Sequence, residues 1–421
     1  FELINWFGGL PYIDKAFEAN DPLDLPRPTY QEAAAKAAED FRKAADLLPI
    51  NWDNTAAGKA TFNKNDLRIN KVMALAYLGK CYLWASSPLM EHGAQTGGAN
   101  TYNYNKELAQ KAADAFGELL ALVEGGQTQY ALAEFNYSDV YNHTKAPGAA
   151  NSFSDNFYTR KQNWRQPGTV EAIFRGPSPD YNGSNWNTTK VFGPKVDGVV
   201  GHDVVIHQPT ANAVEMYGMA NGLPLDHPES GYDPKHPFKD RDPRLYETVL
   251  VPRESFPSGV VGDYNGKTHI DTWVDGAMDY DSGNFGNLAD DAATRYRKFK
   301  WMLDYSGGKM DDKMIGVSYI RLAEMYLISA EAEARMNGGS LSSSDKGYEL
   351  IKTLRQRANG PEDVMPLSLD LEWILKERTR ELYWEGHRRV DLIRYNKFTT
   401  ASYPWPYKAG VKDGNAAIDD Y

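Results

Sequence analysis

Cysteine is nearly absent from this chain, with Cys81 the only one among 421 residues. A single cysteine forms neither an intramolecular disulfide nor a thiolate metal cage, and we expect it to be a small buried residue of a helix. No run of about 18 apolar residues occurs, so no transmembrane helix is predicted. Basic residues are outnumbered, 46 against 57 acidic ones, for a net charge of −11. This balance, without a local basic cluster, argues against nucleic acid as a partner.

Catalytic motifs are also missing. The eight histidines form no His-x-x-x-His or His-Glu-x-x-His pair, and no Gly-x-Ser-x-Gly elbow, Walker loop or dinucleotide fingerprint occurs. Glu377, Glu381 and Glu385 are spaced i, i+4, i+8, and a carboxylate pair is what a glycosidase needs. Arg378 and Arg380 lie between them, however, a spacing that is typical of a structural ion-pair ladder on a helix. The sequence therefore predicts a protein that is not an enzyme.

One stretch resembles a calcium loop. It runs from Asp279 to Asn284 and is followed by Asp290 and Asp291, which gives it acidic residues suited to the ion. Its glycine comes one position early, and no Glu stands at the twelfth position. We therefore expect no cofactor, and a calcium ion bound here would have a structural role.

Helical periodicity is concentrated towards the two ends of the chain. It predicts helices over Thr29–Leu48, Asp66–Trp84, Lys106–Val123, Ser318–Met336, Ser344–Ala358 and Leu369–Trp384, with short ones at Pro209–Tyr217 and Arg388–Tyr395. In between, Gly, Pro, Asn and Asp interrupt the chain every few residues. We expect three regions that fold as one unit: helical hairpins over 1–125, a loop-rich ligand-binding region over 126–313, and helices again over 314–421.

The helical parts contain a degenerate repeat. Ala37, Phe41 and Ala44 have the small–aromatic–small spacing of the second helix of a tetratricopeptide repeat, and the residues around Phe116 repeat it loosely. Helical hairpins of this kind cannot bury their apolar faces alone and must stack. Unrelated amphipathic helices with the same Ala and aromatic bias would give a similar pattern. The predicted fold class is mostly α, a degenerate tetratricopeptide superhelix that carries a large irregular region.

The irregular region places aromatic rings beside amide and hydroxyl groups. The whole chain contains ten Trp and 26 Tyr. A ring can stack on the apolar face of a sugar while Asn, Asp or Arg side chains bind its hydroxyls, although rings that anchor loops to a core produce the same composition. The candidate ligand-binding residues are Trp164, Tyr181, Asn182, Asn185, Trp186, Tyr264, Trp273 and Tyr280.

The last third of the chain carries three recognisable motifs. Residues 320–332 read Ile-Arg-Leu-Ala-Glu-Met-Tyr-Leu-Ile-Ser-Ala-Glu-Ala, and residues 354–358 read Leu-Arg-Gln-Arg-Ala. Residues 377–394 read Glu-Arg-Thr-Arg-Glu-Leu-Tyr-Trp-Glu-Gly-His-Arg-Arg-Val-Asp-Leu-Ile-Arg. Together these motifs resemble the signature of the SusD/RagB family. Weaker similarities at 8–12 and at 241–244, Arg-Asp-Pro-Arg, extend the resemblance over nearly the whole chain.

This resemblance implies a non-catalytic, outward-facing lipoprotein of the cell outer membrane. Such a protein binds an oligosaccharide or polysaccharide and delivers it to a SusC-like TonB-dependent transporter. A peptide- or protein-binding importer subunit on the same scaffold, as in RagB, is the alternative. The signature residues Glu381, Glu385, Arg388, Asp391 and Arg394 fall at roughly i+3/i+4 spacing across a glycine. We expect them to clamp two consecutive helices as framework residues rather than to contact ligand.

The beginning of the chain lacks the family's lipidated cysteine and first helix, and the end lacks its Pro- and Asn-rich tail. The sequence opens on Phe1-Glu2-Leu3, already within a helical pattern and without a start signal. We therefore expect a trimmed sequence, and membrane contact only through a lipid anchor that precedes it.

Overall fold

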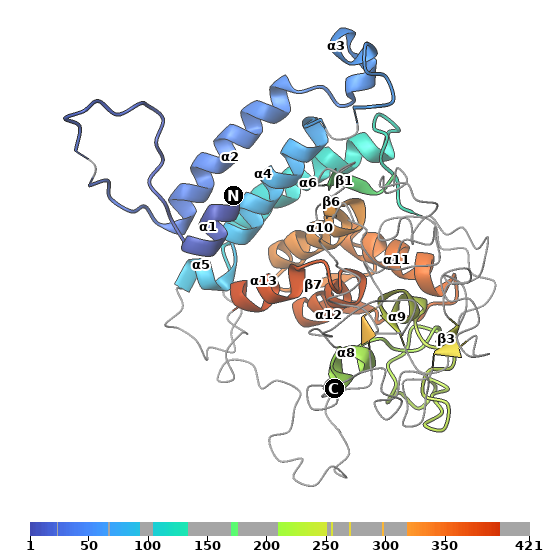
Figure 1. The fold of residues 1–421 in the computed structure, drawn as a ribbon. Coiled ribbons are helices and arrows are strands. Elements are labelled where there is room, and N and C mark those ends of the chain that lie inside the picture. Colours follow the sequence, from blue (N-terminus) through green and yellow to red (C-terminus); the bar gives the residue numbers. More distant parts are fainter. Residues whose placement is uncertain are drawn as a thin grey trace, which may run out of the picture.

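The computed structural model describes residues 1–22, 24–65, 68–92, 104–133, 170–175, 209–250 and 318–395, with short strands at 254–255, 269–270 and 297–298. Within these residues the protein is mostly helical, and its strands form two-stranded pairs rather than a closed sheet (Figure 1). The predicted mostly-α fold class is confirmed.

Three long helices form a stack at the N-terminal side of the molecule (Figure 1). α2 (Tyr30–Leu47) and α6 (Lys106–Glu124) pack on either side of α4 (Lys71–Ala85). α2 begins at a capping box, in which the Thr29 hydroxyl accepts the Glu32 amide hydrogen and the Glu32 carboxylate accepts that of Thr29. α4 is buried on nearly all sides, as its position between two helices requires.

Small residues let these helices approach closely. Gly79 of α4 has no side chain, and the Phe116 ring of α6 lies where a Cβ atom on Gly79 would be. Towards α2, the Tyr77 ring stacks on Phe41 with the ring centroids 5.2 Å apart. Phe41 and Phe116 are among the repeat-like positions of the sequence. Their packing is consistent with a tetratricopeptide-like superhelix.

α10 (Leu322–Met336) joins the two helical parts of the chain. It packs on α6 of the N-terminal stack and also on α11 (Lys346–Asn359) and α12 (Leu371–Glu381). Its apolar residues therefore enter two hydrophobic clusters. Met325 lies in the cluster shared with α4 and α6, and Leu327 lies in the cluster shared with α11 and α12.

The remaining described elements are short. The helices are α1 (Glu2–Phe7), η1 (Trp52–Asn54), α3 (Ala56–Lys59), α5 (Pro88–His92), α8 (Ala211–Glu215), α9 (Pro243–Thr248) and α13 (His387–Arg394). The antiparallel strand pairs are β1 (Ala172–Arg175) with β6 (Ser318–Arg321), β2 (Val249–Leu250) with β5 (Arg297–Lys298), β3 (Glu254–Ser255) with β4 (His269–Ile270), and β7 (Ser340–Ser342) with β8 (Ser368–Asp370).

All eight predicted helices exist, but three of their starts are wrong. The helix predicted from Asp66 begins at Lys71, because the Asn70 side chain caps it there. Ser318 and Leu369 were predicted to be helical, yet both lie in strands that pair with distant segments. Cys81 is fully buried, as predicted, and burial raises the pKa of its thiol to about 12. None of the described helices combines the length and apolar character needed to cross a membrane.

Candidate functional site

The predicted sugar-binding residues lie outside the described part of the chain. These residues are Trp164, Tyr181, Asn182, Asn185, Trp186, Tyr264, Trp273 and Tyr280. The stretch that resembles a calcium loop, 279–291, also lies outside it. Their roles stay predictions.

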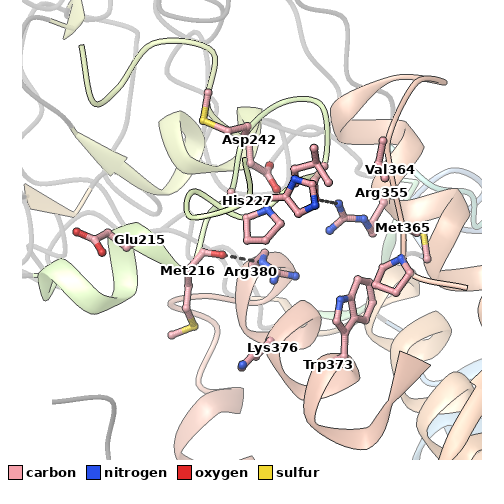
Figure 2. Close-up of a pocket in the computed structure, with 16 residues that line it drawn as sticks. Glu215, Met216, His227, Asp242, Arg355, Val364, Met365, Trp373, Lys376 and Arg380 are labelled. Atoms are coloured by element: carbon pink, nitrogen blue, oxygen red, sulfur yellow. Dashed lines mark hydrogen bonds between the residues drawn. The ribbon is translucent and has the colours of Figure 1, made fainter. Parts of the chain in front are cut away.

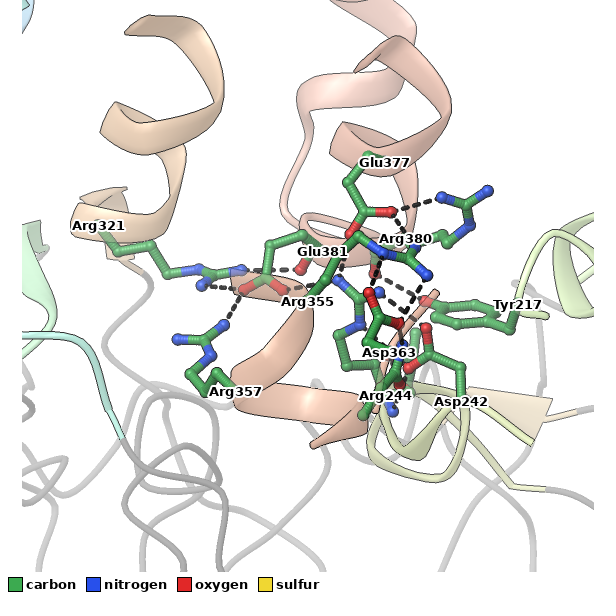
Figure 3. A network of polar contacts seen from close by, with 12 residues as sticks. Tyr217, Asp242, Arg244, Arg321, Arg355, Arg357, Asp363, Glu377, Arg380 and Glu381 are labelled. Atoms are coloured by element: carbon green, nitrogen blue, oxygen red, sulfur yellow. Dashed lines mark hydrogen bonds and ion pairs between the residues drawn. The ribbon is translucent and has the colours of Figure 1, made fainter. Parts of the chain in front are cut away.

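The third family motif supplies the centre of a buried charge network on α12 (Figure 3). The Glu377 carboxylate accepts hydrogen bonds from Arg244 of α9 at 2.7 Å and from Arg355 of α11 at 3.0 Å. Arg380, one turn further along α12, donates to the same carboxylate. The side chains of Glu377, Arg244 and Arg355 are at most 3% exposed. Charges as buried as these are stable only in the company of opposite charges.

Glu381 connects α12 to segments from three other parts of the chain. Its carboxylate accepts from Arg321 of β6 at 2.7 Å, from Arg244 at 3.0 Å, and from Arg357 of α11. Arg321 and Arg357 both reach on to Glu171, the residue that precedes β1. The network therefore joins the segments around Glu171 and Arg244 to the C-terminal helices.

Among the described residues, the network includes six carboxylates and five guanidiniums. They belong to Glu171, Asp242, Asp363, Glu377, Glu381 and Glu385, and to Arg244, Arg321, Arg355, Arg357 and Arg380. Burial opposes ionisation of Glu377 and Glu381, but the guanidiniums outweigh it and hold the pKa of both well below the ordinary value. Because both carboxylates are ionised and closed off from water, they cannot serve as the acid and base of a glycosidase.

A second buried cluster ties α13 to α10 and α12. Arg394 forms a two-point pair with Glu331 of α10, one bond being 2.6 Å long, and also bonds to Asp391 at 2.7 Å. Asp391 in turn accepts from Arg378 of α12 at 3.0 Å. Burial opposes the charge on Asp391, yet Arg378 and Arg394 keep the pKa of its carboxyl below the ordinary value. Three helices thus share one set of charges.

Four of the five signature residues, Glu381, Glu385, Asp391 and Arg394, form buried ion pairs, but with partners that differ in part from those predicted. Glu381 and Glu385 do not pair across the following glycine. Both bond to Arg321, which lies 60 and 64 positions earlier in the chain. Asp391 with Arg394 is a pair at the predicted local spacing. Ion pairs between residues far apart in the sequence therefore connect these helices where pairs at i+3/i+4 spacing were expected.

The predicted ladder on α12 is also only partly present. Glu377 does pair with Arg380 at i, i+3 spacing. Arg378 turns instead towards Asp391 of α13. Arg388 is partly buried, and its Nε atom makes no hydrogen bond within the described structure.

A cavity of about 490 Å³ opens beside the charge network (Figure 2). Small-ligand pockets generally measure ~300–1,000 Å³. The walls come from α8 and the chain after it, α11, the chain before β8, and α12. The lining residues are Glu215, Met216, Gly218, Met219, Gly222, Leu223, Pro224, His227, Asp242, Arg355, Val364, Met365, Pro366, Trp373, Lys376 and Arg380. We call this cavity the Trp373 pocket.

The buried charges fix the shape of the Trp373 pocket. Arg355 and Arg380 belong both to the network and to the pocket wall, and their guanidinium carbons lie 5.4 and 5.8 Å from the centroid of the Trp373 ring. Arg380 also donates to the Met216 carbonyl at 2.7 Å, and Tyr217 donates to the Arg380 carbonyl at 3.0 Å. Sequence reasoning missed this pocket, since its walls come from separate segments that no single motif marks.

A second cavity, of about 600 Å³, lies where α1, α4, β6 and the turn before α13 meet. The aromatic residues that line it are Phe1, Tyr77, Trp84, Phe174, Tyr319 and Trp384. Lys80 and His387 also line it, and both face the buried Glu324, at 2.9 and 3.5 Å. We call this cavity the aromatic hollow. Within the described residues, no group of three or more His, Cys, Asp or Glu side chains is arranged to hold a metal ion.

Comparisons with known proteins agree with this architecture. The family model described as "SusD family" matches residues 170–420, more than half of the chain. The protein therefore belongs to the SusD family. The starch-binding protein SusD of Bacteroides thetaiotaomicron is 36% identical over 105 residues, which are 25% of this chain and 17% of that protein.

Solved structures show the same fold. A SusD-like protein from Bacteroides fragilis has a TM-score of 0.62 at 20% identity, over 94% of this chain and 66% of the other. A second Bacteroides fragilis structure, titled a SusD-like carbohydrate binding protein, has a TM-score of 0.58 at 20% identity, over 95% of this chain and 64% of the other. The chain thus spans just under two thirds of these two structures.

Proposed function

We propose that this protein binds an oligosaccharide or polysaccharide at the cell surface without cleaving it. Membership of the SusD family, with a relative named for starch binding, is the observation that supports the proposal. The physical support is that different parts of the chain have different tasks. Buried ion pairs join the C-terminal helices to α9 and β6, while the aromatic residues predicted to bind sugar come from the middle region that the sequence predicts to be loop-rich.

The proposal extends to location and delivery. The protein is an outward-facing lipoprotein of the outer membrane, and it passes its glycan to a SusC-like TonB-dependent transporter. Co-expression of the two proteins, followed by affinity purification through a tag on this one, tests the partnership. Recovery of the transporter in stoichiometric amounts is the expected result, and its absence from the purified material contradicts the delivery step.

Calorimetric titration with a panel of plant and host oligosaccharides tests glycan binding. We expect at least one glycan to bind with a dissociation constant in the micromolar to millimolar range, roughly −8 to −4 kcal/mol. Trp186→Ala and Trp273→Ala should weaken that binding about tenfold each, because a stacked aromatic contributes ~0.5–1.5 kcal/mol beyond the area that it buries. No binding to any member of a broad panel would contradict the proposal.

Two control variants locate the sugar. Trp6 lies on α1, is 62% exposed and is not a predicted contact, so Trp6→Ala should leave the affinity unchanged. Tyr319 lines the aromatic hollow and is 53% exposed, so Tyr319→Ala tests whether the glycan lies there. A loss of affinity in Tyr319→Ala alone would move the sugar site from the irregular region to the hollow. Incubation with the bound glycan should release no new reducing ends.

A further inference from the structure

The Trp373 pocket has a lining unlike that of a sugar site. Three methionines, two prolines, a leucine, a valine and one tryptophan form its apolar part. Among the described residues that line it there is no Asn, Gln, Ser, Thr or Tyr, whose side chains each offer a sugar hydroxyl both a donor and an acceptor. Methionine is flexible and polarisable, and it is common on surfaces that accept peptide side chains. The pocket is therefore suited to an apolar group of another polypeptide.

Most of the charged side chains around the pocket already form ion pairs within the protein. Arg355 holds Asp363 through two bonds of 2.8 Å and reaches Glu377 at 3.0 Å. Asp242 is bonded twice to Arg244. Because Arg355 and Asp242 are already neutralised by these internal ion pairs, they offer little net charge to a ligand.

Lys376 is the exception. It lies one turn after Trp373 on the same face of α12, is partly exposed, and has no ion pair or hydrogen bond within the described structure. Arg380, a further turn along, keeps 15% of its side chain exposed. Burial, with a smaller contribution from the nearby Arg355 guanidinium, lowers the pKa of Arg380 despite its bond to Glu377.

The acidic lining does not neutralise this positive edge. Asp242 is occupied by Arg244, as described. Figure 2 shows the Glu215 carboxylate at the far wall, pointing away from Arg380. The same view places Trp373 and Met365 on one side of Arg380 and Met216 on the other. The apolar part of the pocket between Trp373 and Met216, which we call the slot, thus ends at Lys376 and Arg380.

From this juxtaposition we infer that the Trp373 pocket is a docking site for a segment of a protein partner. The segment has one large apolar side chain, which enters the slot between Trp373 and Met216. It also has an Asp or Glu next to that side chain, which pairs with Lys376. The pocket would thus serve attachment of another protein. The inference involves none of the predicted glycan contacts and does not depend on them.

The test uses a random dodecapeptide library displayed on phage, selected on the whole protein. Enriched peptides should combine a bulky apolar residue with Asp or Glu within two positions. Their affinity, measured by fluorescence polarisation, should fall about tenfold in the Lys376→Glu variant. A peptide whose acidic residue is changed to Lys should regain affinity for Lys376→Glu, and this exchange of charges is what a general loss of structure cannot produce.

Matched variants make the outcome decisive. Lys43→Glu makes the same charge change on the exposed surface of α2 and should leave peptide binding unchanged. Val364→Asp, at the 48% exposed pocket rim, should weaken it. Peptides that bind Lys376→Glu and the unaltered protein equally, or a library that yields no enriched sequence, would overturn the inference. The inference would also be overturned if an acidic oligosaccharide, such as oligogalacturonate, bound to the unaltered protein but not to Lys376→Glu and did not compete with the selected peptides. Lys376 would then serve a sugar ligand.

Discussion

Replacement of Arg321 by Met tests whether the buried network holds the molecule together. Arg321 is 1% exposed and bonds to Glu171, Glu381 and Glu385. Without it, six buried carboxylates share four guanidiniums in place of five. Removal of one partner from a buried ion pair generally costs about 3–5 kcal/mol, and we expect a loss of stability in that range.

Arg42→Met is the matched control. Arg42 makes the same kind of contacts, to Glu118 and Asp46, but its side chain is 36% exposed and those of its partners are 37% and 61% exposed. Water compensates such groups, so the control should lose about 0–1 kcal/mol. The comparison isolates burial, because the residue that is removed and the residue that replaces it are identical.

Urea unfolding followed by tryptophan fluorescence measures both variants. With an m value of about 3 kcal/mol per molar urea, Arg321→Met should lower the midpoint by about 1 M or more, and the control by about 0.3 M or less. Equal shifts for the two variants would refute the reasoning.

Three further outcomes are expected. The pKa of Glu377 lies below its unfolded value, so this carboxylate stabilises the fold above about pH 4.5 and loses that contribution as the pH falls further; melting temperatures between pH 7 and 3 should drop most steeply below that point. Gly79→Ala should lower the melting temperature, since a Cβ would lie 2.2 Å from the Phe116 ring, whereas Gly117→Ala, with open space around it, should raise the stability by about 0.5–1 kcal/mol. Thr29→Ala removes the capping box of α2 and should cost about 1 kcal/mol in urea unfolding.

Local patterns predicted most of the helices, because helix formation and capping act over three or four residues. The apolar periodicity of 29–48 and 106–123 was enough for α2 and α6. It failed at Ser318 and Leu369, where the backbone pairs with strands that lie far away in the sequence. A periodicity that extends a helix backwards contains no information about such a partner. The strand pairs β1–β6 and β7–β8 could therefore be identified only from the structure.

The spacing of the signature residues predicted that they would form ion pairs, but it did not predict their partners. Glu381 bonds to Arg244, which is 137 residues away, and Arg357 bonds to Glu171 at a separation of 186. Charge spacing on one helix cannot identify either contact. The Trp373 pocket was missed for the same reason. Its ring and its cation both lie on α12, but its three methionines come from segments that meet α12 only after folding.

The order in which the ribosome delivers these charges has a consequence for biogenesis. Arg244 leaves the exit tunnel 133 residues ahead of Glu377, and Glu171 leaves it 150 residues ahead of Arg321. Until the last helices emerge, each early ion lacks late-arriving counter-ions and must stay hydrated. Closure of the interior therefore waits for the C-terminal helices, and a nascent protein that pauses before residue 377 would present a hydrated, incomplete centre to chaperones and proteases.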